Sequence, residues 1–288
     1  MHTISKYQTA LNNHPFSLTD EQVSKHTSNI IKDHFAENNT QEVLKLLYSC
    51  IDLTTLNSTD TREHIWNFVE KVNAFEGSNP EIPNVAAICV YPNFAKTVKE
   101  ALTANVNIAC VAGGFPSSQT FSEIKIAEAA LAIEDGADEI DIVLNLGLFL
   151  EEDYEELCEE IMEIKQACRD AKLKVILETG ALRTSDSIHK ASILSIYSGA
   201  NFLKTSTGKG YPGATLEAAY VICHAIKAYY QKTDIKVGFK VSGGVSSIDD
   251  AVKYYTLVKE ILGEAWCNNN LFRIGTSRLA DKLLEGIK

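Results

Sequence analysis

The sequence lacks any apolar run of the roughly 18 residues that a membrane-spanning helix requires. The polar segment from Met1 to Asp20 also has no apolar core behind a basic start, so we expect no secretory signal. The seven cysteines, an odd number, show no CxxC spacing, and most of them interrupt apolar runs. We therefore expect reduced thiols in the core of a cytoplasmic protein.

Basic residues are in deficit, with 27 Lys and Arg against 38 Asp and Glu and a formal net charge of -11. Such a chain offers no general basic face that could release phosphate counterions, which argues against nucleic acid or an anionic membrane as a partner. A small anionic substrate would need a locally positive pocket. The hydrophobic content of 45% and the charged content of 23% are ordinary for a globular chain of 288 residues.

Several catalytic motifs are also missing. The seven histidines show neither HxH nor HExxH spacing, and none lies at the end of a predicted strand, so we expect no metal and no cofactor. Neither a GxSxG elbow nor a GxxxxGK[ST] loop occurs. We interpret His64 and His189 as residues of helix surfaces, and the acidic stretch from Glu151 to Glu160 as the solvated face of a helix.

Short β-branched runs alternate with longer segments of helical period along the chain. Eight strands followed by helical segments favour a closed parallel (β/α)8 barrel. A doubly wound open sheet gives the same local signals and is the alternative, but the number of strands favours the barrel. The predicted strands are Cys50–Leu53, Val85–Tyr91, Asn107–Ala112, Glu139–Leu144, Lys174–Glu178, Phe202–Ser206, Val237–Val241 and Leu271–Gly275.

Helical periodicity also precedes the first strand, at Glu21–Ala36 and Gln41–Tyr48. No linker rich in Pro, Gly or Ser follows these segments. We therefore expect residues 1–45 to form an N-terminal helical extension packed on a barrel of residues 46–288. Within the barrel, helices are predicted at Ser122–Asp135, Tyr154–Ala171, Ile188–Ser198 and Ile248–Leu262.

Six charged residues interrupt apolar strands. Alternate side chains of a barrel strand point inward, so a charge flanked by apolar residues is expected inside the barrel. Any one of these charges is most simply a buried ion pair, which adds little stability. Together, three lysines and several carboxylates converge on one interior near the strand ends where barrel active sites are built. They are Asp52, Asp141, Lys174, Glu178, Lys204 and Lys240.

Lysines grouped in one interior suit amine catalysis. A free lysine, with a pKa of about 10.4, is neutral in about one molecule in a few thousand at pH 7, and the neutral amine is the form that attacks a carbonyl. A second ammonium and a partly dry site both lower that pKa. We predict that Lys204 is the nucleophile, that Lys240 supplies the charge repulsion, and that Asp141 accepts and returns protons. By this logic alone, Lys174 is an alternative nucleophile.

Glycines lie in the loops that follow the last three predicted strands. Backbone N–H groups at glycines approach anions closely, and the helix N-termini that follow favour negative charge. A single glycine pair is most simply a tight turn. Three adjacent loops together with Lys209 and Arg278 favour a phosphate site, which barrels often build at this position. The loops are Gly208-Lys209-Gly210, Ser242-Gly243-Gly244-Val245-Ser246 and Gly275-Thr276-Ser277-Arg278.

Five runs of the sequence resemble those of the 2-deoxyribose-5-phosphate aldolase family, from about residue 46 to about residue 280. Lys204-Thr205-Ser206-Thr207-Gly208-Lys209 is the most specific of them. The others are Ile51-Asp52-Leu53-Thr54-Thr55-Leu56, Ala86-Ala87-Ile88-Cys89-Val90-Tyr91-Pro92, Asp138-Glu139-Ile140-Asp141 and Gly238-Phe239-Lys240.

The resemblance implies a class I aldolase that cleaves 2-deoxy-D-ribose 5-phosphate to acetaldehyde and D-glyceraldehyde 3-phosphate through a lysine Schiff base, without a cofactor. It implies the Schiff base at Lys204, pKa depression by Lys240 and a proton relay at Asp141, which favours Lys204 over Lys174. The expected partners of the protein are thus a phosphorylated sugar and small aldehydes. A homo-oligomer is also compatible with the sequence. The other implied residues are Asp52, Thr54, Lys174 and Thr205 for substrate, and Gly208, Lys209, Gly243, Gly244, Gly275 and Ser277 for phosphate.

One basic residue of many relatives is replaced by Ser246 in this chain, and Arg278 is a candidate to compensate for it. Two alternatives to the implied reaction stay open. One keeps the barrel and the lysine but changes the sugar phosphate, as in a Schiff-base aldolase of the transaldolase type. The other is a barrel that binds sugar phosphates without catalysing a reaction.

Overall fold

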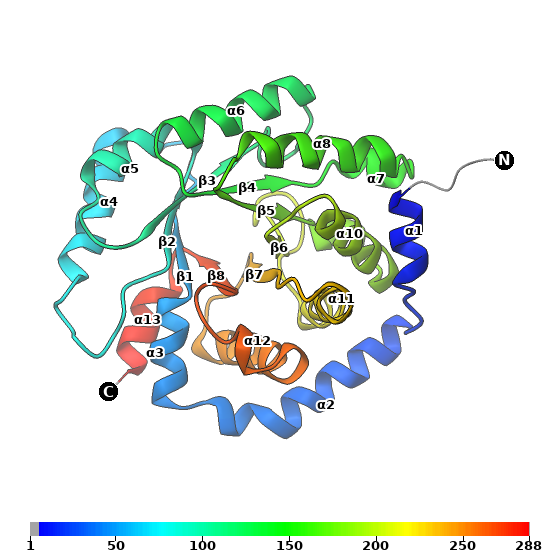
Figure 1. Cartoon of the computed structure of the whole chain (residues 1–288). Helices are drawn as coiled ribbons and strands as arrows, with labels where there is room; N and C mark the ends of the chain where they lie inside the picture. The colour runs from blue at the N-terminus through cyan, green and yellow to red at the C-terminus, as the bar shows by residue number, and fades with distance from the viewer. Residues whose placement is uncertain (1–5, 288) are drawn as a thin grey trace.

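Residues 6–287 are described by the computed structural model of the chain. Eight parallel strands close into a barrel in the order β1 to β8, with β8 hydrogen-bonded to β1 (Figure 1). This closure confirms the predicted (β/α)8 barrel and excludes the open sheet. The strands are β1 Ile51–Thr54, β2 Ala87–Val90, β3 Asn107–Ala112, β4 Glu139–Val143, β5 Lys172–Ile176, β6 Phe202–Lys204, β7 Gly238–Ser242 and β8 Phe272–Thr276.

Helices surround the barrel and connect its strands (Figure 1). None of those within residues 6–287 is long and apolar enough to cross a lipid bilayer. The helices are α1 Lys6–Asn13, α2 Asp20–Asn38, α3 Gln41–Ser49, α4 Arg62–Phe75, α5 Ala95–Ala101, α6 Ser122–Glu134, α7 Leu146–Leu150, α8 Tyr154–Ala167, α9 Thr179–Leu182, α10 Ser185–Tyr197, α11 Leu216–Thr233, α12 Ile248–Leu262 and α13 Leu279–Gly286, with 3-10 turns η1 Pro92–Phe94 and η2 Glu264–Trp266.

Several element boundaries differ from the prediction by a few residues, and for two helices the local reason is clear. Helix α8 ends at Ala167 rather than Ala171, and Arg169 just beyond it has a positive φ of 51° that no helix continues through. Helix α10 begins at Ser185, three residues before the predicted start at Ile188. Its N-cap, Thr184, accepts a hydrogen bond from the backbone N–H of Ser187, which fixes this earlier start.

Strand β5 begins and ends two residues before its predicted bounds, and this shift corrects the placement of Glu178. That residue lies beyond the strand with a left-handed backbone, φ 54°. Its carboxylate accepts hydrogen bonds from the Thr207 hydroxyl at 2.6 Å and the Thr207 N–H at 3.2 Å. Glu178 is buried as expected but does not join the lysines, because the alternation of side chains ends with the strand.

The barrel interior is divided into an apolar part and a charged part. Small apolar side chains of β2 and β3 pack together, among them Ala87, Cys89, Ala109 and Val111. The charged part is contributed by β1 and by β4 to β8. In the register of the sheet, Asp141 lies beside Lys174 and Lys204 lies beside Lys240, so charged side chains of neighbouring strands meet at one height.

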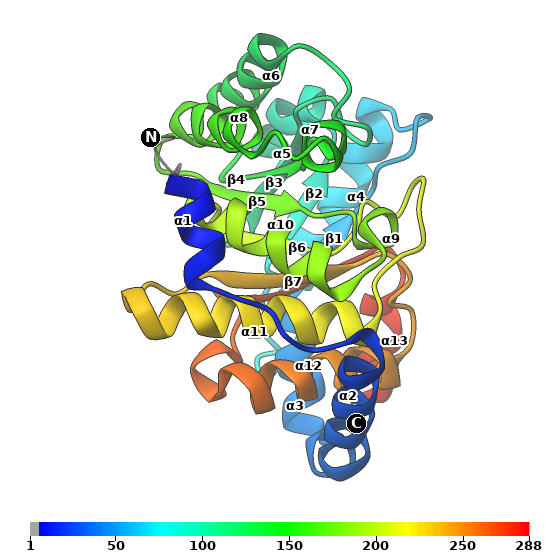
Figure 2. The same cartoon turned by 90° about the vertical axis from the view of Figure 1, so that its right-hand side faces the viewer.

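The first three helices pack on the outside of the barrel. Helix α1 contacts α8 and α10, α2 contacts α11 and α12, and α3 contacts α12 and α13 (Figures 1 and 2). Asp20 Oδ1 accepts a 2.8 Å hydrogen bond from the Ser185 N–H at the start of α10. Ser24 Oγ donates to Glu217 Oε1 at 3.2 Å in the first turn of α11. Helix α2 is thus fastened to the first turns of two barrel helices.

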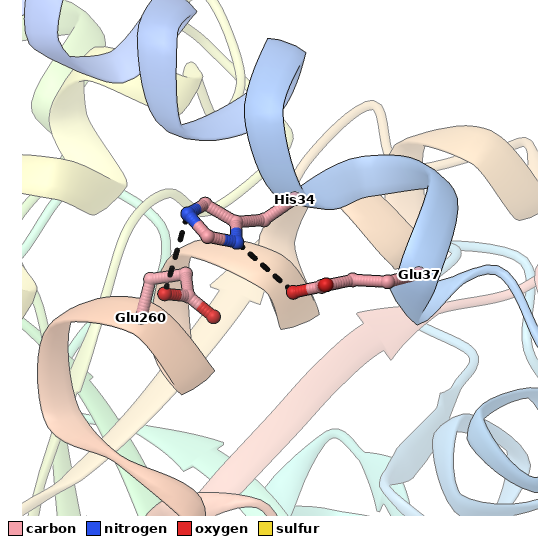
Figure 3. Close-up of side chains that lie close together, drawn as sticks. All are labelled: His34, Glu37 and Glu260. Carbon is pink, nitrogen blue, oxygen red and sulfur yellow. Dashed lines mark hydrogen bonds and ion pairs between the residues drawn. The ribbon is translucent and has the colours of Figure 1, made fainter.

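His34 of α2 lies between two carboxylates on this outer surface (Figure 3). Its Nδ1 is 2.9 Å from Glu37 Oε1 on the same helix, and its Nε2 is 3.7 Å from Glu260 Oε2 on α12. Each ring nitrogen faces its own carboxylate, and all three side chains are accessible to solvent. We interpret the cluster as an ion pair that links the two helices.

Candidate active site

Lys204 is the last residue of β6, and its ammonium lies at the floor of a cavity at the carboxyl ends of the strands. The residue is 4% exposed. Its Nζ donates a 2.9 Å hydrogen bond to Asp141 Oδ2 of β4. Bulky apolar neighbours such as Leu203 face the surrounding helices, so the pleat of the strand turns the lysine inward.

Asp141 is the centre of the charged cluster. Its Oδ2 accepts hydrogen bonds from both Lys204 and Lys240, the latter at 2.8 Å. Its Oδ1 accepts from Lys174 at 2.8 Å. One fully buried carboxylate therefore holds all three ammonium groups that the sequence places inside the barrel.

A second layer of charges lies beneath Asp141. Lys240 Nζ is 2.6 Å from Asp52 Oδ2, and Lys174 Nζ is 2.6 Å from Glu139 Oε2. Arg273 of β8 joins these carboxylates, at 2.6 Å from Asp52 Oδ1 and 2.8 Å from Glu139 Oε1. Every member of this layer is at most 1% exposed, so each charge depends on its partners for stabilisation.

Sequence reasoning missed Glu139 and Arg273. Both were inside predicted strands, and Glu139 has the same strand parity as Asp141, two residues further on. Arg273 lies between Phe272 and Ile274, which is the flanking pattern that identified the other charges. Applying the parity rule to every charge in a predicted strand would have found both residues.

Four basic side chains face three carboxylates in this network. With every group ionised, four positive and three negative charges leave one net positive charge in a dry interior, which is unfavourable. Loss of the Lys204 proton would balance the network. Lys204 is also the one base of the four paired with a single carboxylate in the network. The members are Lys174, Lys204, Lys240 and Arg273 with Asp52, Glu139 and Asp141.

The pKa values of the lysines separate accordingly. Burial lowers the pKa of Lys204; Asp141 opposes this shift, the charge of Lys240 adds to it, and the net pKa lies below the ordinary value. Burial acts in the same direction on Lys240, but the carboxylates of Asp141 and Asp52 outweigh it and hold that pKa above the ordinary value. Lys174 likewise keeps a raised pKa against burial, through Asp141 and Glu139. Lys204 is thus the lysine of the three that loses its proton most readily.

The cavity above Lys204 has a volume of about 580 Å³. The three predicted glycine loops line it together, as does Thr54 at the end of β1. Lys209 donates from Nζ to the carbonyl oxygen of Leu56 at 2.5 Å, across the mouth of the cavity. The predicted residues that line it are Thr54, Lys204, Gly208, Lys209, Gly243, Gly244, Gly275 and Ser277, with Ser246 and Arg278.

Three predicted substrate-binding residues lie elsewhere. Asp52 and Lys174 are fully buried beneath the cavity, inside the ion network. Thr205 is buried at the end of β6, where its hydroxyl donates to the Ser242 carbonyl at 2.9 Å and accepts from the Ser242 N–H at 3.0 Å. These residues support the floor and the rim of the cavity from behind. Burial also separates Lys174 from any bound carbonyl.

Other sequence interpretations need correction. His189 is buried at 5% exposure and stacks on Phe16, with ring centroids 4.9 Å apart, so it is not a surface residue. The interpretation of His64 as a helix-surface residue is confirmed, since it is a half-exposed residue of α4, and it also lines the cavity above Lys204. Glu160 departs from the solvated acidic face, since it is buried against Lys125 at 2.8 Å. The spacing of charged residues along a helix does not show which of them are buried against a neighbouring helix.

A second cavity, of about 590 Å³, lies on the outer surface between α4 and α5. It is lined by Trp66, Lys96 and Glu100 among others, and none of the buried network faces it. Its slightly larger volume therefore does not make it the better candidate. The smaller cavity is the candidate active site, because buried charges converge there beside three glycine loops.

A closed (β/α)8 barrel with a lysine of lowered pKa beside a cavity at the carboxyl ends of its strands has the architecture of a TIM-barrel enzyme. The family model described as DeoC/LacD family aldolase matches residues 46–261, and the chain belongs to this family.

Relatives of known name agree with this assignment. The deoxyribose-phosphate aldolase of Homo sapiens is 41% identical over 240 residues, which cover 80% of this chain and 76% of that protein. A solved structure named QR15, an aldolase, is 30% identical with a TM-score of 0.68 and covers 84% of this chain and 96% of its own. The deoxyribose phosphate aldolase of Aeropyrum pernix, whose structure is described as a unique tetramer, is 25% identical with a TM-score of 0.67, covering 89% and 96%.

Proposed function

We propose that this protein cleaves 2-deoxy-D-ribose 5-phosphate reversibly to acetaldehyde and D-glyceraldehyde 3-phosphate, with Lys204 as the Schiff-base residue. The observation that carries the proposal is the sharing of Asp141 Oδ2 by Lys204 and Lys240 at the floor of the cavity. Burial and the neighbouring cation favour a neutral amine at Lys204, and the network beneath it keeps the other lysines charged.

The reaction begins when the neutral amine of Lys204 attacks the C1 aldehyde of the open-chain sugar. Loss of water gives a protonated imine, which withdraws electrons from C2. The C3 hydroxyl then loses its proton, the C2–C3 bond breaks, and its electron pair forms an enamine while C3 becomes the aldehyde of the leaving D-glyceraldehyde 3-phosphate. Protonation of the enamine at C2 gives the imine of acetaldehyde. Its hydrolysis consumes one water, which balances the water lost earlier, releases acetaldehyde and restores the amine.

Asp141 is the proposed proton relay, because its carboxylate is within 2.9 Å of the reacting nitrogen. Its pKa lies well below the ordinary value, since three ammonium groups outweigh the effect of burial. Asp141 is therefore ionised near neutral pH and can accept a proton from Lys204 while the imine forms. In this proposal Asp52 and Lys174 hold Asp141 and Lys240 in position rather than contacting the sugar.

The glycine loops are the proposed phosphate side of the site. Gly208, Gly243, Gly244 and Gly275 line the cavity, and the first three have positive φ values of 73°, 84° and 88°, which suit backbone N–H groups turned toward an anion. The cations Lys209 and Arg278 line the same wall, and Ser277 adds a hydroxyl. Thr54 lines the cavity from the end of β1. Thr205, just beyond β6, supports the rim from behind through its two hydrogen bonds to the Ser242 backbone.

Borohydride trapping with acetaldehyde, followed by peptide mapping, tests the proposal. Wild-type protein should gain the mass of one reduced ethyl adduct on Lys204, and Lys204→Ala should gain none. Lys209→Ala is the matched control, because it removes a cavity lysine outside the network and should still be trapped at Lys204. Absence of trapping in the wild type from about pH 6 to about pH 9 would favour a silent sugar-phosphate binder. If the protein cleaves other sugar phosphates faster than 2-deoxy-D-ribose 5-phosphate, a transaldolase-type reaction would be favoured.

Two further features belong to the proposal. We assign residues 1–45 to an extension of a catalytic barrel at 46–288, although α3 crosses this boundary; the family match at 46–261 supports it. We also assign the protein to the cytoplasm, because all seven cysteines are unpaired thiols and six of them are buried.

A further inference from the structure

The proposed phosphate side of the site, formed by the three glycine loops with Lys209 and Arg278, has few cationic side chains that could pair with a phosphate. Of its two permanent cations, Lys209 already donates to the Leu56 carbonyl, and the chain as a whole carries a net charge of -11. The glycine loops supply N–H dipoles rather than full charges. Besides Lys204, Lys209 and Arg278, the cavity is lined by the imidazole of His64 on α4. The proposed function does not yet use this side chain.

His64 is held in one orientation by a buried carboxylate. Its Nδ1 is 2.9 Å from Asp60 Oδ1, and the Asp60 side chain is 2% exposed. Asp60 is fixed in turn, because its Oδ2 accepts from the Thr55 hydroxyl at 2.8 Å and from the Asn57 N–H at 3.0 Å. A carboxylate bound to one ring nitrogen sets the direction of the other.

The other nitrogen, Nε2, lies on the opposite edge of the ring. Within residues 6–287, no side chain or backbone group forms a hydrogen bond with it. Phe68, one helical turn further along α4, lines the same cavity, so this face of the helix is directed toward the site. A phosphate oxygen in the cavity would be the partner that Nε2 lacks.

A purely structural interpretation of His64 is a fastening at the start of α4. The Thr61 hydroxyl caps the helix by accepting from the His64 N–H at 3.1 Å, and this bond needs no imidazole. A fastening also needs no contact with the cavity, whereas the His64 side chain is 51% exposed and lines it. The Thr61 cap therefore does not account for the position of the imidazole, whose Nε2 is available to a ligand in the cavity.

We propose that His64 is a further binding residue for the phosphate group of the substrate and that Asp60 is its positioning residue. In the complex the ring is an imidazolium, whose Nδ1 donates to Asp60 and whose Nε2 donates to a phosphate oxygen. This inference rests on the proposed function, in which the substrate carries a phosphate. It predicts that His64 distinguishes phosphorylated from unphosphorylated sugar and takes no part in the chemistry at Lys204.

Kinetics of the full chain with two sugars test the inference. His64→Gln should raise KM for 2-deoxyribose 5-phosphate about tenfold, the factor expected for one charge-assisted hydrogen bond at a partly exposed site, and should change kcat less than about twofold. The kinetics with unphosphorylated 2-deoxyribose should stay unchanged. His64→Lys should recover part of the affinity, because it restores a positive charge. His34→Gln is the matched control, since it removes a half-exposed histidine with the same Nδ1–carboxylate contact outside the cavity.

Calorimetric titration with inorganic phosphate separates this inference from the proposed function. The wild type should bind phosphate about tenfold more tightly than His64→Gln, whether or not it cleaves any sugar. If the wild type binds phosphate in this way but cleaves neither sugar, the proposed function fails and the His64 assignment stands. Equal phosphate affinities, or equal losses for both sugars in His64→Gln, would overturn the assignment. Thermal unfolding of both His64 variants verifies that they are folded.

Discussion

Lys204 and Lys240 are register partners on neighbouring strands, and their ammonium groups donate to the same carboxylate oxygen of Asp141. The two lysines nevertheless have opposite pKa shifts. Lys240 has a second carboxylate beneath it at Asp52, whereas Lys204 faces the cavity and has none. The difference in proton affinity therefore arises from one additional ion pair.

Lys240→Leu should reduce kcat/KM by at least about 100-fold at pH 7. Without the neighbouring cation, Lys204 keeps Asp141 Oδ2 to itself, so its pKa rises and fewer molecules carry the neutral amine. The acidic limb of the pH–rate profile should then move to higher pH, which steady-state assays across the pH range would measure. Lys172→Leu, at the partly exposed start of β5, is the control and should leave the profile in place. A limb that moves to lower pH would contradict this explanation.

Asp141→Asn should destabilise the fold by about 3–5 kcal/mol and abolish trapping. The amide has nearly the same shape, but three buried ammonium groups lose their shared counter-charge. Urea unfolding followed by circular dichroism gives the free energy of unfolding. A loss below about 0.5 kcal/mol would show that the network does not depend on this carboxylate.

Gly213→Ala should separate two loops of the site. A Cβ at this position would lie 2.2 Å from the carbonyl oxygen of Gly243, so the backbone must move. We expect a loss of stability of about 1–3 kcal/mol and a KM for the phosphorylated sugar raised by about tenfold or more. Gly210→Ala is the control in the same loop, because a Cβ there meets no atom within 4 Å. Similar KM values for the two variants would refute the close-contact argument.

The free energy of unfolding should decrease as the pH falls from about 6.5 toward about 4, partly through His189. Burial lowers the pKa of His189 from 6.5 to about 4 in the folded protein. In that window the unfolded chain binds the proton and the folded protein does not, so protonation favours unfolding, by up to about 1.4 kcal/mol per pH unit for one group. Urea unfolding at several pH values measures the slope. His189→Leu should make it shallower, and an unchanged slope would assign the effect to other groups.

The sequence was sufficient for the barrel and for most of its reactive interior. Strand parity placed Asp141, Lys204 and Lys240 inside because apolar residues flank each of them, and the structure has all three in contact. Parity failed for Glu178, since the rule holds only while the strand continues. The expectation that the charges lie near the carboxyl ends of the strands holds for Lys204, whereas Asp141 occupies the middle of its strand.

Residues outside the strands were harder to predict. His64 gave no signal, because its position depends on the loop that carries Asp60 and on the tilt of α4 toward the cavity. His189 is buried by Phe16, which belongs to a segment about 170 residues away whose path no local pattern determines. A contact between segments so far apart in the sequence can be identified only once the tertiary structure is known.

The division of the barrel interior has a consequence for improving the thermal robustness of this enzyme. Redesign of a core usually exchanges aliphatic residues, but six of the eight strands here contribute a charged side chain to one network of mutually dependent ions. Any such exchange would remove an ion from the network around Lys204, the proposed nucleophile. Stabilising substitutions are therefore better sought in the outer helices. The contacts of α2 with α10 and α11 are the first positions to vary.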